Sequence, residues 1–138
     1  MADFLNSEHY PDPTAYFAMR NIEREERRKA YKPLVYICSP FSGDVERNTF
    51  KAREYSRYAI QRGCIPLAPH LLFPQFMSEE TERELAMQMD LILLTKCDEL
   101  WVFGEKVTKG MGTEINKAER KHIKIRYFSD SIREVDIK

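Results

Sequence analysis

From residue 33 onward, short apolar runs alternate with longer segments in which apolar residues recur at helical spacing. The run at residues 34–39, LVYICS, has β-branched and aromatic members, which is typical of a fully buried strand. Together the apolar runs predict four strands, at residues 34–39, 64–69, 98–104 and 123–128. The segments of helical spacing predict helices at residues 44–63, 78–97 and 110–122. Residues 70–77 predict a loop with aromatic side chains, and residues 129–138 predict a last short helix.

The N-terminal segment has a different pattern. Residues 1–13 are rich in turn-forming residues, and residues 14–32 predict one strongly charged helix that Pro33 ends. The apolar residues of this helix gather near its start, where we expect it to pack on the domain or on a partner subunit. We therefore expect two parts: an N-terminal helical extension at 1–32 and one domain at 33–138.

Alternating strands and helices predict right-handed crossovers and a parallel sheet with helices on both faces. The expected fold is α/β, a Rossmann-like (flavodoxin-like) parallel sheet of four to five strands. In such sheets, ligands bind beyond the carboxyl ends of the strands. That rule directs attention to three segments, which are SPFSG after the first strand, APH after the second and GEKVTKGMGTE after the third.

Composition narrows the range of partners. The chain has 138 residues, 32% of them charged, and a formal net charge of zero, so it lacks the basic excess that nucleic acid polymers and anionic membranes attract. Its three cysteines lie in apolar runs, which is typical of buried thiols in a reducing cytosol. There is no long apolar span and no signal-peptide pattern, so we expect a cytoplasmic location. His9 and His122 lack partners at metal-ligand spacing, and no Walker or dinucleotide motif occurs, so we expect neither metal nor cofactor.

Two carboxylates are candidates for chemistry. Glu114 follows Gly110 and Gly112, which would let the backbone turn tightly and approach a ligand. Glu114 is either an acid that favours the first turn of a helix or a catalytic group. Asp90 lies in a strongly apolar stretch, so it either reaches a polar rim or faces a site. Asp98, in contrast, is expected to order the turn between a helix and the third strand.

Polar residues near the first two strands could complete such a site. Tyr36 lies within the first strand, where a buried hydroxyl needs a partner; Glu114 or a backbone carbonyl would serve. Ser39 and Gly43 stand where phosphate- or sugar-binding loops stand in parallel α/β proteins. His70, after the second strand, is either a structural histidine or a ligand contact.

Taken together, four stretches resemble one known family. They are VYICSPFSG, GCIPLAPH, QMDLILLTKCDELWVFG and TKGMGTEINKA. Over residues 33–128, their order and spacing resemble the nucleoside 2-deoxyribosyltransferase-like superfamily, which includes 5′-nucleotide N-glycosidases. The resemblance implies metal-free cleavage or exchange of the N-glycosidic bond of a nucleoside or nucleotide. It also implies assembly into homo-oligomers in which a neighbour completes the site.

The resemblance assigns roles to particular positions. It implies that Glu114 attacks the anomeric carbon, that Tyr36 hydrogen-bonds Glu114, and that Asp90 handles the base. It places four residues of the first loop against base or sugar: Ser39, Pro40, Phe41 and Gly43.

Two positions depart from the family pattern. Thr108 stands where the nucleoside transferases carry an aspartate and the deoxynucleotide hydrolases a phosphate-binding serine. A hydroxyl beside Gly110 and Gly112 would donate to phosphate, so we expect hydrolysis of a 5′-monophosphate, with Arg47, Lys106 and Lys109 as possible helpers. Asn116 replaces a small glycine of the family.

Two other kinds of protein remain open. The first is a nucleotide-binding or sensor protein of the same fold that does not catalyse a reaction. The second is an oligomeric interaction protein whose function lies in the charged helix 14–32.

Overall fold

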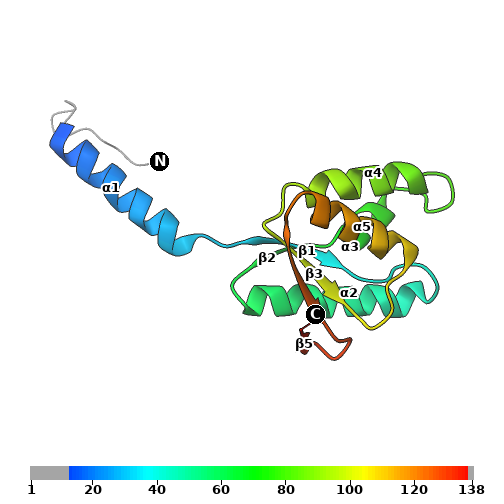
Figure 1. Cartoon of the computed structure of the whole chain (residues 1–138). Helices are drawn as coiled ribbons and strands as arrows, with labels where there is room; N and C mark the ends of the chain where they lie inside the picture. The colour runs from blue at the N-terminus through cyan, green and yellow to red at the C-terminus, as the bar shows by residue number, and fades with distance from the viewer. Residues whose placement is uncertain (1–12, 137–138) are drawn as a thin grey trace. The chain divides into compact units, whose positions relative to one another are not determined.

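The computed structural model describes residues 13–136, which form two units divided between Tyr31 and Lys32. The first unit contains one helix, α1 (Pro13–Ala30), close to the predicted helix (Figure 1). Within it, the Arg20 guanidinium donates to the Tyr16 hydroxyl at 2.8 Å. The turn-rich residues 1–12 lie outside the described residues, and packing of α1 on another surface stays a prediction.

The second unit is built on one five-stranded sheet. Its strands are β1 (Leu34–Cys38), β2 (Ile65–Leu67), β3 (Glu99–Phe103), β4 (Lys124–Phe128) and β5 (Glu134–Val135). Their order is β2-β1-β3-β4-β5. The first four are parallel and β5 is antiparallel to β4. This is the flavodoxin-like order, so the predicted fold class is confirmed.

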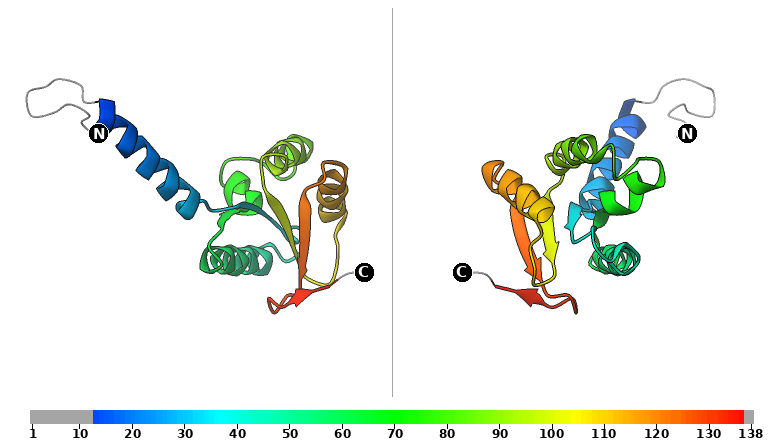
Figure 2. Two further views of the ribbon diagram at one scale, coloured as in Figure 1. Left: turned by 60° about the vertical axis from the view of Figure 1, so that its left-hand side comes forward. Right: turned by 90° about the vertical axis from the view of Figure 1, so that its right-hand side faces the viewer.

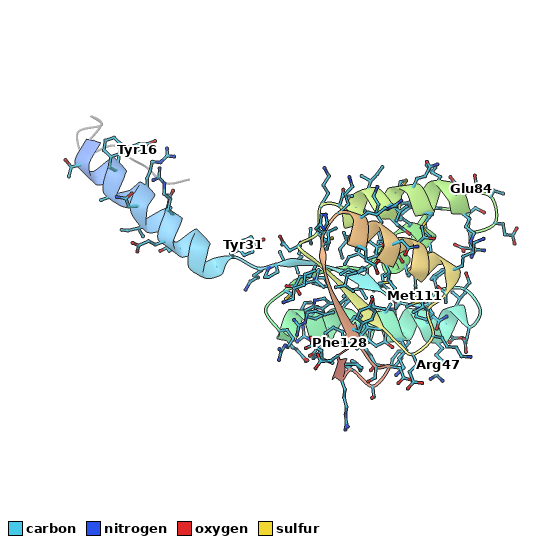
Figure 3. The ribbon with its side chains drawn as sticks, viewed as in Figure 1. Tyr16, Tyr31, Arg47, Glu84, Met111 and Phe128 are labelled. Atoms are coloured by element: carbon cyan, nitrogen blue, oxygen red, sulfur yellow. The ribbon has the colours of Figure 1, made fainter. Side chains whose placement is uncertain are left out.

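Helices cover both faces of the sheet (Figure 2). Helix α2 (Val45–Gln61) covers one face, where Tyr55 and Ala59 pack on inward residues of β1, β3 and β4. Phe128, at the end of β4, belongs to this layer (Figure 3). Helices α4 (Arg83–Leu94) and α5 (Lys109–Arg120) cover the other face.

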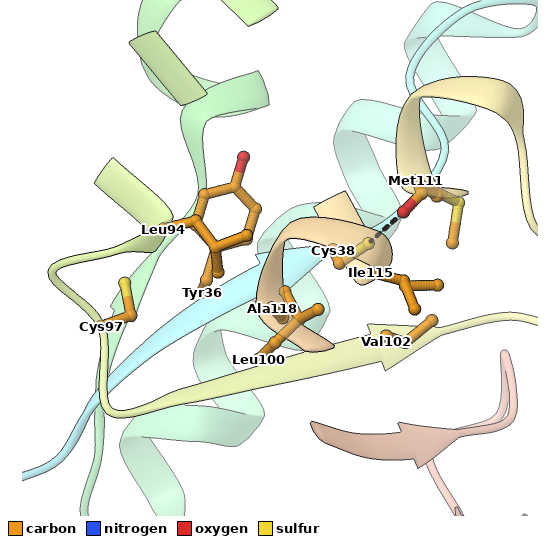
Figure 4. Close-up of a cluster of buried hydrophobic side chains, with 9 residues drawn as sticks. All are labelled: Tyr36, Cys38, Leu94, Cys97, Leu100, Val102, Met111, Ile115 and Ala118. Carbon is orange, nitrogen blue, oxygen red and sulfur yellow. Dashed lines mark hydrogen bonds between the residues drawn. The ribbon is translucent and has the colours of Figure 1, made fainter. Parts of the chain in front are cut away.

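Strand β1 contributes side chains to both layers of the core. Because side chains alternate along a strand, Val35 and Ile37 face α2, whereas Tyr36 and Cys38 face α4 and α5 (Figure 4). Each of these four residues is almost fully buried. The alternation therefore explains why β1 appears in the sequence as an unbroken apolar run.

Three predicted elements differ from the structure. The expected loop at 70–77 contains helix α3 (Pro69–Leu72) and a 3₁₀ turn, η1 (Phe73–Gln75). Helix α4 begins at Arg83 and not at Ser78, because the Ser78 hydroxyl accepts from the Thr81 N–H and Glu82 accepts from the Ser78 N–H, closing a separate turn. The expected C-terminal helix is wrong, since this segment pairs with β4 as strand β5.

Two reciprocal contacts hold the start of β1 to the start of β3. The Leu34 N–H donates to Asp98 Oδ2 at 2.8 Å, and the Asp98 N–H donates to the Leu34 carbonyl at 2.8 Å. Asp98 thus orders the turn before β3, as predicted. This edge holds the amino ends of the strands, and the candidate site lies at the opposite edge.

Candidate active site

A pocket opens beyond the carboxyl end of β1, on the side of the sheet that α4 and α5 cover. The loop after β1, helix α3, residues 73–79, helix α4 and the start of α5 line it. Its volume is about 130 Å³. A single buried water needs only about 10–15 Å³ on this kind of measure, so the pocket has room for more than one water. Its place agrees with the rule for ligand sites in open α/β sheets.

Four buried polar atoms converge on this region without hydrogen-bond partners among the described residues. They are the Tyr36 hydroxyl, Ser39 Oγ, Asp90 Oδ1 and Glu114 Oε2. Ser39, Asp90 and Glu114 line the pocket. Buried polar groups are nearly always hydrogen-bonded, because leaving one unsatisfied costs about 1–3 kcal/mol. Four such atoms in one region are typical of a site whose bonds are completed by a ligand.

Glu114 lies in the second turn of α5 and is 2% exposed. No acid occupies the first turn of that helix, so the interpretation of Glu114 as a first-turn acid is wrong. The Cys38 thiol donates to Glu114 Oε1 at 3.7 Å. Burial raises the pKa of Glu114 to about 8, while the nearby Tyr36 hydroxyl and Cys38 thiol oppose that rise.

Asp90 lies in α4 with a 5% exposed side chain. It faces the pocket, so the alternative that it reaches a solvent rim is wrong. Burial raises the pKa of Asp90 to about 7, and the negative charge of Glu79 adds to the rise. Two carboxyl groups that hold protons near neutral pH therefore share one pocket.

Tyr36 lies on β1 beneath the pocket and does not line it. Its hydroxyl lies close enough to Glu114 to lower the pKa of that carboxyl group, although the two groups are not within ordinary hydrogen-bond distance, so a full bond between them stays a prediction. The two groups still interact, because burial and then the Glu114 charge raise the pKa of Tyr36 well above its usual value.

Thr108 and the two glycines have roles that differ from the prediction. Thr108 is the N-cap of α5, and its Oγ1 accepts from the Met111 N–H at 3.3 Å. Gly110 and Gly112 lie inside the helix and have no positive φ, so the predicted glycine turn is wrong. A Cβ at Gly110 would lie 3.3 Å from the terminal methyl of Met87, so this glycine lets α5 approach α4 closely. Thr108 and Gly110 line the pocket, and Gly112 does not.

An aromatic pair forms another wall. The rings of Phe41 and His70 stack with centroids 5.0 Å apart, and burial lowers the pKa of His70. Both residues line the pocket. Pro40 and Gly43 do not: Pro40 lines a second hollow, and Gly43, with φ +96°, shapes the loop between β1 and α2.

Sequence reasoning missed Cys38 and several pocket residues. The apolar run around Cys38 predicts only a buried thiol, yet this thiol donates to Glu114 and, at 4.0 Å, to the Met111 carbonyl (Figure 4). Its place two residues after Tyr36 on a strand could have revealed it, since such residues share a face. Met77, Met87 and Arg83 also line the pocket. No motif marked them, because they lie on a turn and a helix whose orientation only the fold determines.

Within residues 13–136, no group of three or more His, Cys, Asp or Glu side chains is arranged to hold a metal ion. None of the helices in the same range is long and apolar enough to span a membrane.

The fold defines a flavodoxin-like α/β protein, and its family can now be stated. A family model described as "Domain of unknown function (DUF7768)" matches residues 33–128, so the chain belongs to that family. A comparison with curated proteins returned no match.

A solved structure provides a comparison for the fold. It is a 2-deoxyribosyltransferase from the psychrotolerant bacterium Bacillus psychrosaccharolyticus, described as a biocatalyst for the synthesis of nucleosides. It is similar with a TM-score of 0.51 and 21% sequence identity, over 75% of this chain and 77% of that one. The likeness shows a shared fold, and it agrees at that level with the resemblance found in the sequence.

Proposed function

We propose that this protein cleaves the N-glycosidic bond of a nucleoside 5′-monophosphate or nucleoside, with water or a second base as acceptor. The observation that carries the proposal is the set of four buried, unpartnered polar atoms on Tyr36, Ser39, Asp90 and Glu114. Two of them belong to carboxyl groups, the pair that glycosidic chemistry uses. The fold that the chain shares with a 2-deoxyribosyltransferase supports the same reaction class.

In the proposed reaction, Glu114 is the nucleophile and Asp90 the acid. An oxygen of Glu114 bonds to the anomeric carbon as the bond from that carbon to the base nitrogen breaks. The proton of Asp90 passes to the departing base. Water then attacks the same carbon, returns a proton to Asp90 and frees the sugar and the Glu114 carboxylate.

The two carboxyl groups differ in their neighbours. Near Glu114 lie two donors, the Tyr36 hydroxyl and the Cys38 thiol, and both lower its pKa. Asp90 has no such donor among the described residues, and a pKa of about 7 lets it hold a proton at neutral pH. In the free protein the pKa of Glu114, about 8, lies above that of Asp90. The reaction therefore requires the positive charge that develops at the anomeric carbon to lower the pKa of Glu114.

The start of α5 is the proposed contact for phosphate or sugar oxygens. Thr108 supplies a hydroxyl and Lys109 a positive charge there, and Arg83, at the start of α4, adds a second positive charge to the pocket lining. The helix dipole adds to this attraction. The stacked rings of Phe41 and His70 are the proposed apolar surface for the base.

A binding protein without turnover is the second candidate. It is favoured by one observation, the pKa of Glu114 of about 8, because a protonated carboxyl group cannot attack carbon. Such a protein would use the same pocket to recognise a nucleotide.

Chromatography of free bases tests both candidates. The protein is incubated with a panel of ribo- and deoxynucleoside 5′-monophosphates and the matching nucleosides. Glu114→Gln tests the proposed nucleophile, and Glu119→Gln, an exposed acid on the same helix, is the matched control. The proposal expects base release that Glu114→Gln abolishes and Glu119→Gln retains. Saturable binding of a nucleotide that stays intact would instead support the sensor.

A further inference from the structure

A second, broader hollow lies beside the pocket and shares only Ser39 with it. Its volume is about 440 Å³, and its walls come from the loop after β1, helix α2, the loop after β3 and the turn before β5. The hollow lies at the α2 side of β1 and β3, the two strands where the chain reverses its direction through the sheet. Ligands in open α/β sheets bind at this reversal.

Three cations line the hollow: Arg47 and Lys51 from α2, and Lys106 from the loop after β3. Of the ion pairs between described residues, none involves these three side chains. Their charges converge from two segments far apart in the sequence, with the unpartnered, 1% exposed Ser39 hydroxyl at the boundary. This arrangement matches a phosphate group, which needs several donors of positive charge.

The remaining polar residues suit a ligand with hydroxyl groups. Glu105 and Asp130 place carboxylates in the same lining, and carboxylates accept from sugar hydroxyls but repel a bare anion. Asn48 holds the wall in place, because its side-chain amide donates to the Phe41 and Ser42 carbonyls at 3.0 and 3.1 Å. The hollow is thus already shaped in the free protein.

We propose that this hollow is a second binding site, for a small sugar phosphate. Its phosphate contacts Arg47, Lys51 and Lys106, and its hydroxyl groups contact Asp130 and Glu105. The inference does not depend on the proposed reaction, since the residues assigned to the phosphate and the sugar hydroxyls lie outside the first pocket, and only Ser39, at the boundary, is common to both.

Titration of the full chain with ribose 5-phosphate, followed by amide NMR, tests this site. The expected result is saturable shifts at Gly104 and Lys106, and binding about tenfold weaker in Lys51→Gln, the size expected for one lost charged hydrogen bond. Lys96→Gln makes the same charge change on an exposed lysine before β3, at the opposite edge of the sheet, and should bind as wild type does.

Three results would overturn the proposal: no saturable shift, shifts confined to Gly110 and its neighbours in the first pocket, or equal weakening by Lys96→Gln. Inorganic phosphate is the second probe. If it bound as tightly as ribose 5-phosphate, the sugar contacts at Asp130 and Glu105 would be wrong. Weaker binding of inorganic phosphate would support them.

Discussion

Replacing Glu114 by glutamine should change how the stability of the protein depends on pH. Burial raises the pKa of Glu114 from 4.5 to about 8 in the folded protein. Between these values the folded state holds a proton that the unfolded state releases. The free energy of unfolding therefore falls as the pH rises through this window. The glutamine side chain of the variant carries no charge at any pH, so the variant loses this contribution.

The size of the effect follows from the shift. Each pKa unit corresponds to about 1.36 kcal/mol, so the buried carboxyl group costs roughly 1 kcal/mol of stability at pH 5 and roughly 3 kcal/mol at pH 7. Relative to wild type, Glu114→Gln should thus gain about 2 kcal/mol of stability between pH 5 and pH 7. Asp90 titrates in both proteins, and because its charge also raises the pKa of Glu114, the difference between them reports Glu114 together with its coupling to Asp90.

Urea unfolding at a series of pH values measures this difference. Glu119→Gln, an exposed acid on the same helix, serves as the control and should follow wild type. Parallel profiles for wild type and Glu114→Gln would refute the reasoning. They would mean that the side chain of Glu114 is hydrated, and that it is not held in a buried, proton-binding site.

Substitutions in the first turns of α5, at Asp98 and at Cys38 also have defined outcomes. Gly112→Ala should raise the free energy of unfolding in urea by about 0.5–1 kcal/mol, because alanine favours a helix and its Cβ would meet Val107 at an ordinary 3.9 Å. Gly110→Ala should raise it by less, since the Met87 side chain must move aside. A loss of stability in Gly112→Ala would contradict this reasoning. Asp98→Ala should lower the free energy of unfolding in urea by about 1–2 kcal/mol, because the Leu34 N–H loses its acceptor. An unchanged urea midpoint would mean that this hydrogen bond is not formed in solution. Cys38→Ala should raise the pKa of Glu114 further, because the carboxyl group loses the thiol as a hydrogen-bond donor, and a carboxyl NMR titration measures this. Cys38→Ser should return the pKa toward its wild-type value, because serine supplies a hydroxyl donor. Identical titrations in wild type and both variants would exclude the thiol as a donor.

The centre of the sheet could be predicted because β1 and β3 are buried on both faces. Four of the five residues of β1 and of β3 are fully buried, so each strand appears in the sequence as a continuous apolar run. The edge strand β5 was harder to predict. Strand β5 has two exposed residues, and it is held by pairing with β4 and by the Arg126 side chain, which donates to Glu134 at 2.8 Å. Such contacts join residues eight positions apart and leave no periodic pattern.

The predicted start of α4 is wrong because hydrogen bonds before it resemble those of a helix N-cap. Ser78 followed by Glu82 resembles a helix start, yet their bonds close an isolated turn before Arg83. Helix α3 has only four residues and depends on packing, with Pro69 buried at its first position. Short helices of this kind have little intrinsic stability, so propensity does not reveal them.

In the candidate site, charge was a better guide than glycine. Asp90 and Glu114 stand out in the sequence because an acid in an apolar setting needs a reason, and both lie buried in one pocket. Gly110 and Gly112 wrongly predict a turn, because a glycine that permits a tight turn and one that permits close helix packing look alike in sequence. The contribution of Cys38 depends on a contact 76 residues away, which the sequence alone could not place.

The central claim is that Glu114 attacks the anomeric carbon, and mass spectrometry tests it most directly. The protein is mixed with a nucleotide from which it releases the base, and the reaction is quenched during turnover. The protein is then digested, and the masses of its peptides are measured. The account predicts a peptide containing Glu114 that has gained the mass of the sugar phosphate, and no such gain and no base release in Glu114→Gln. Base release that continues at the wild-type rate in Glu114→Gln, or a sugar attached to a different residue, would contradict it.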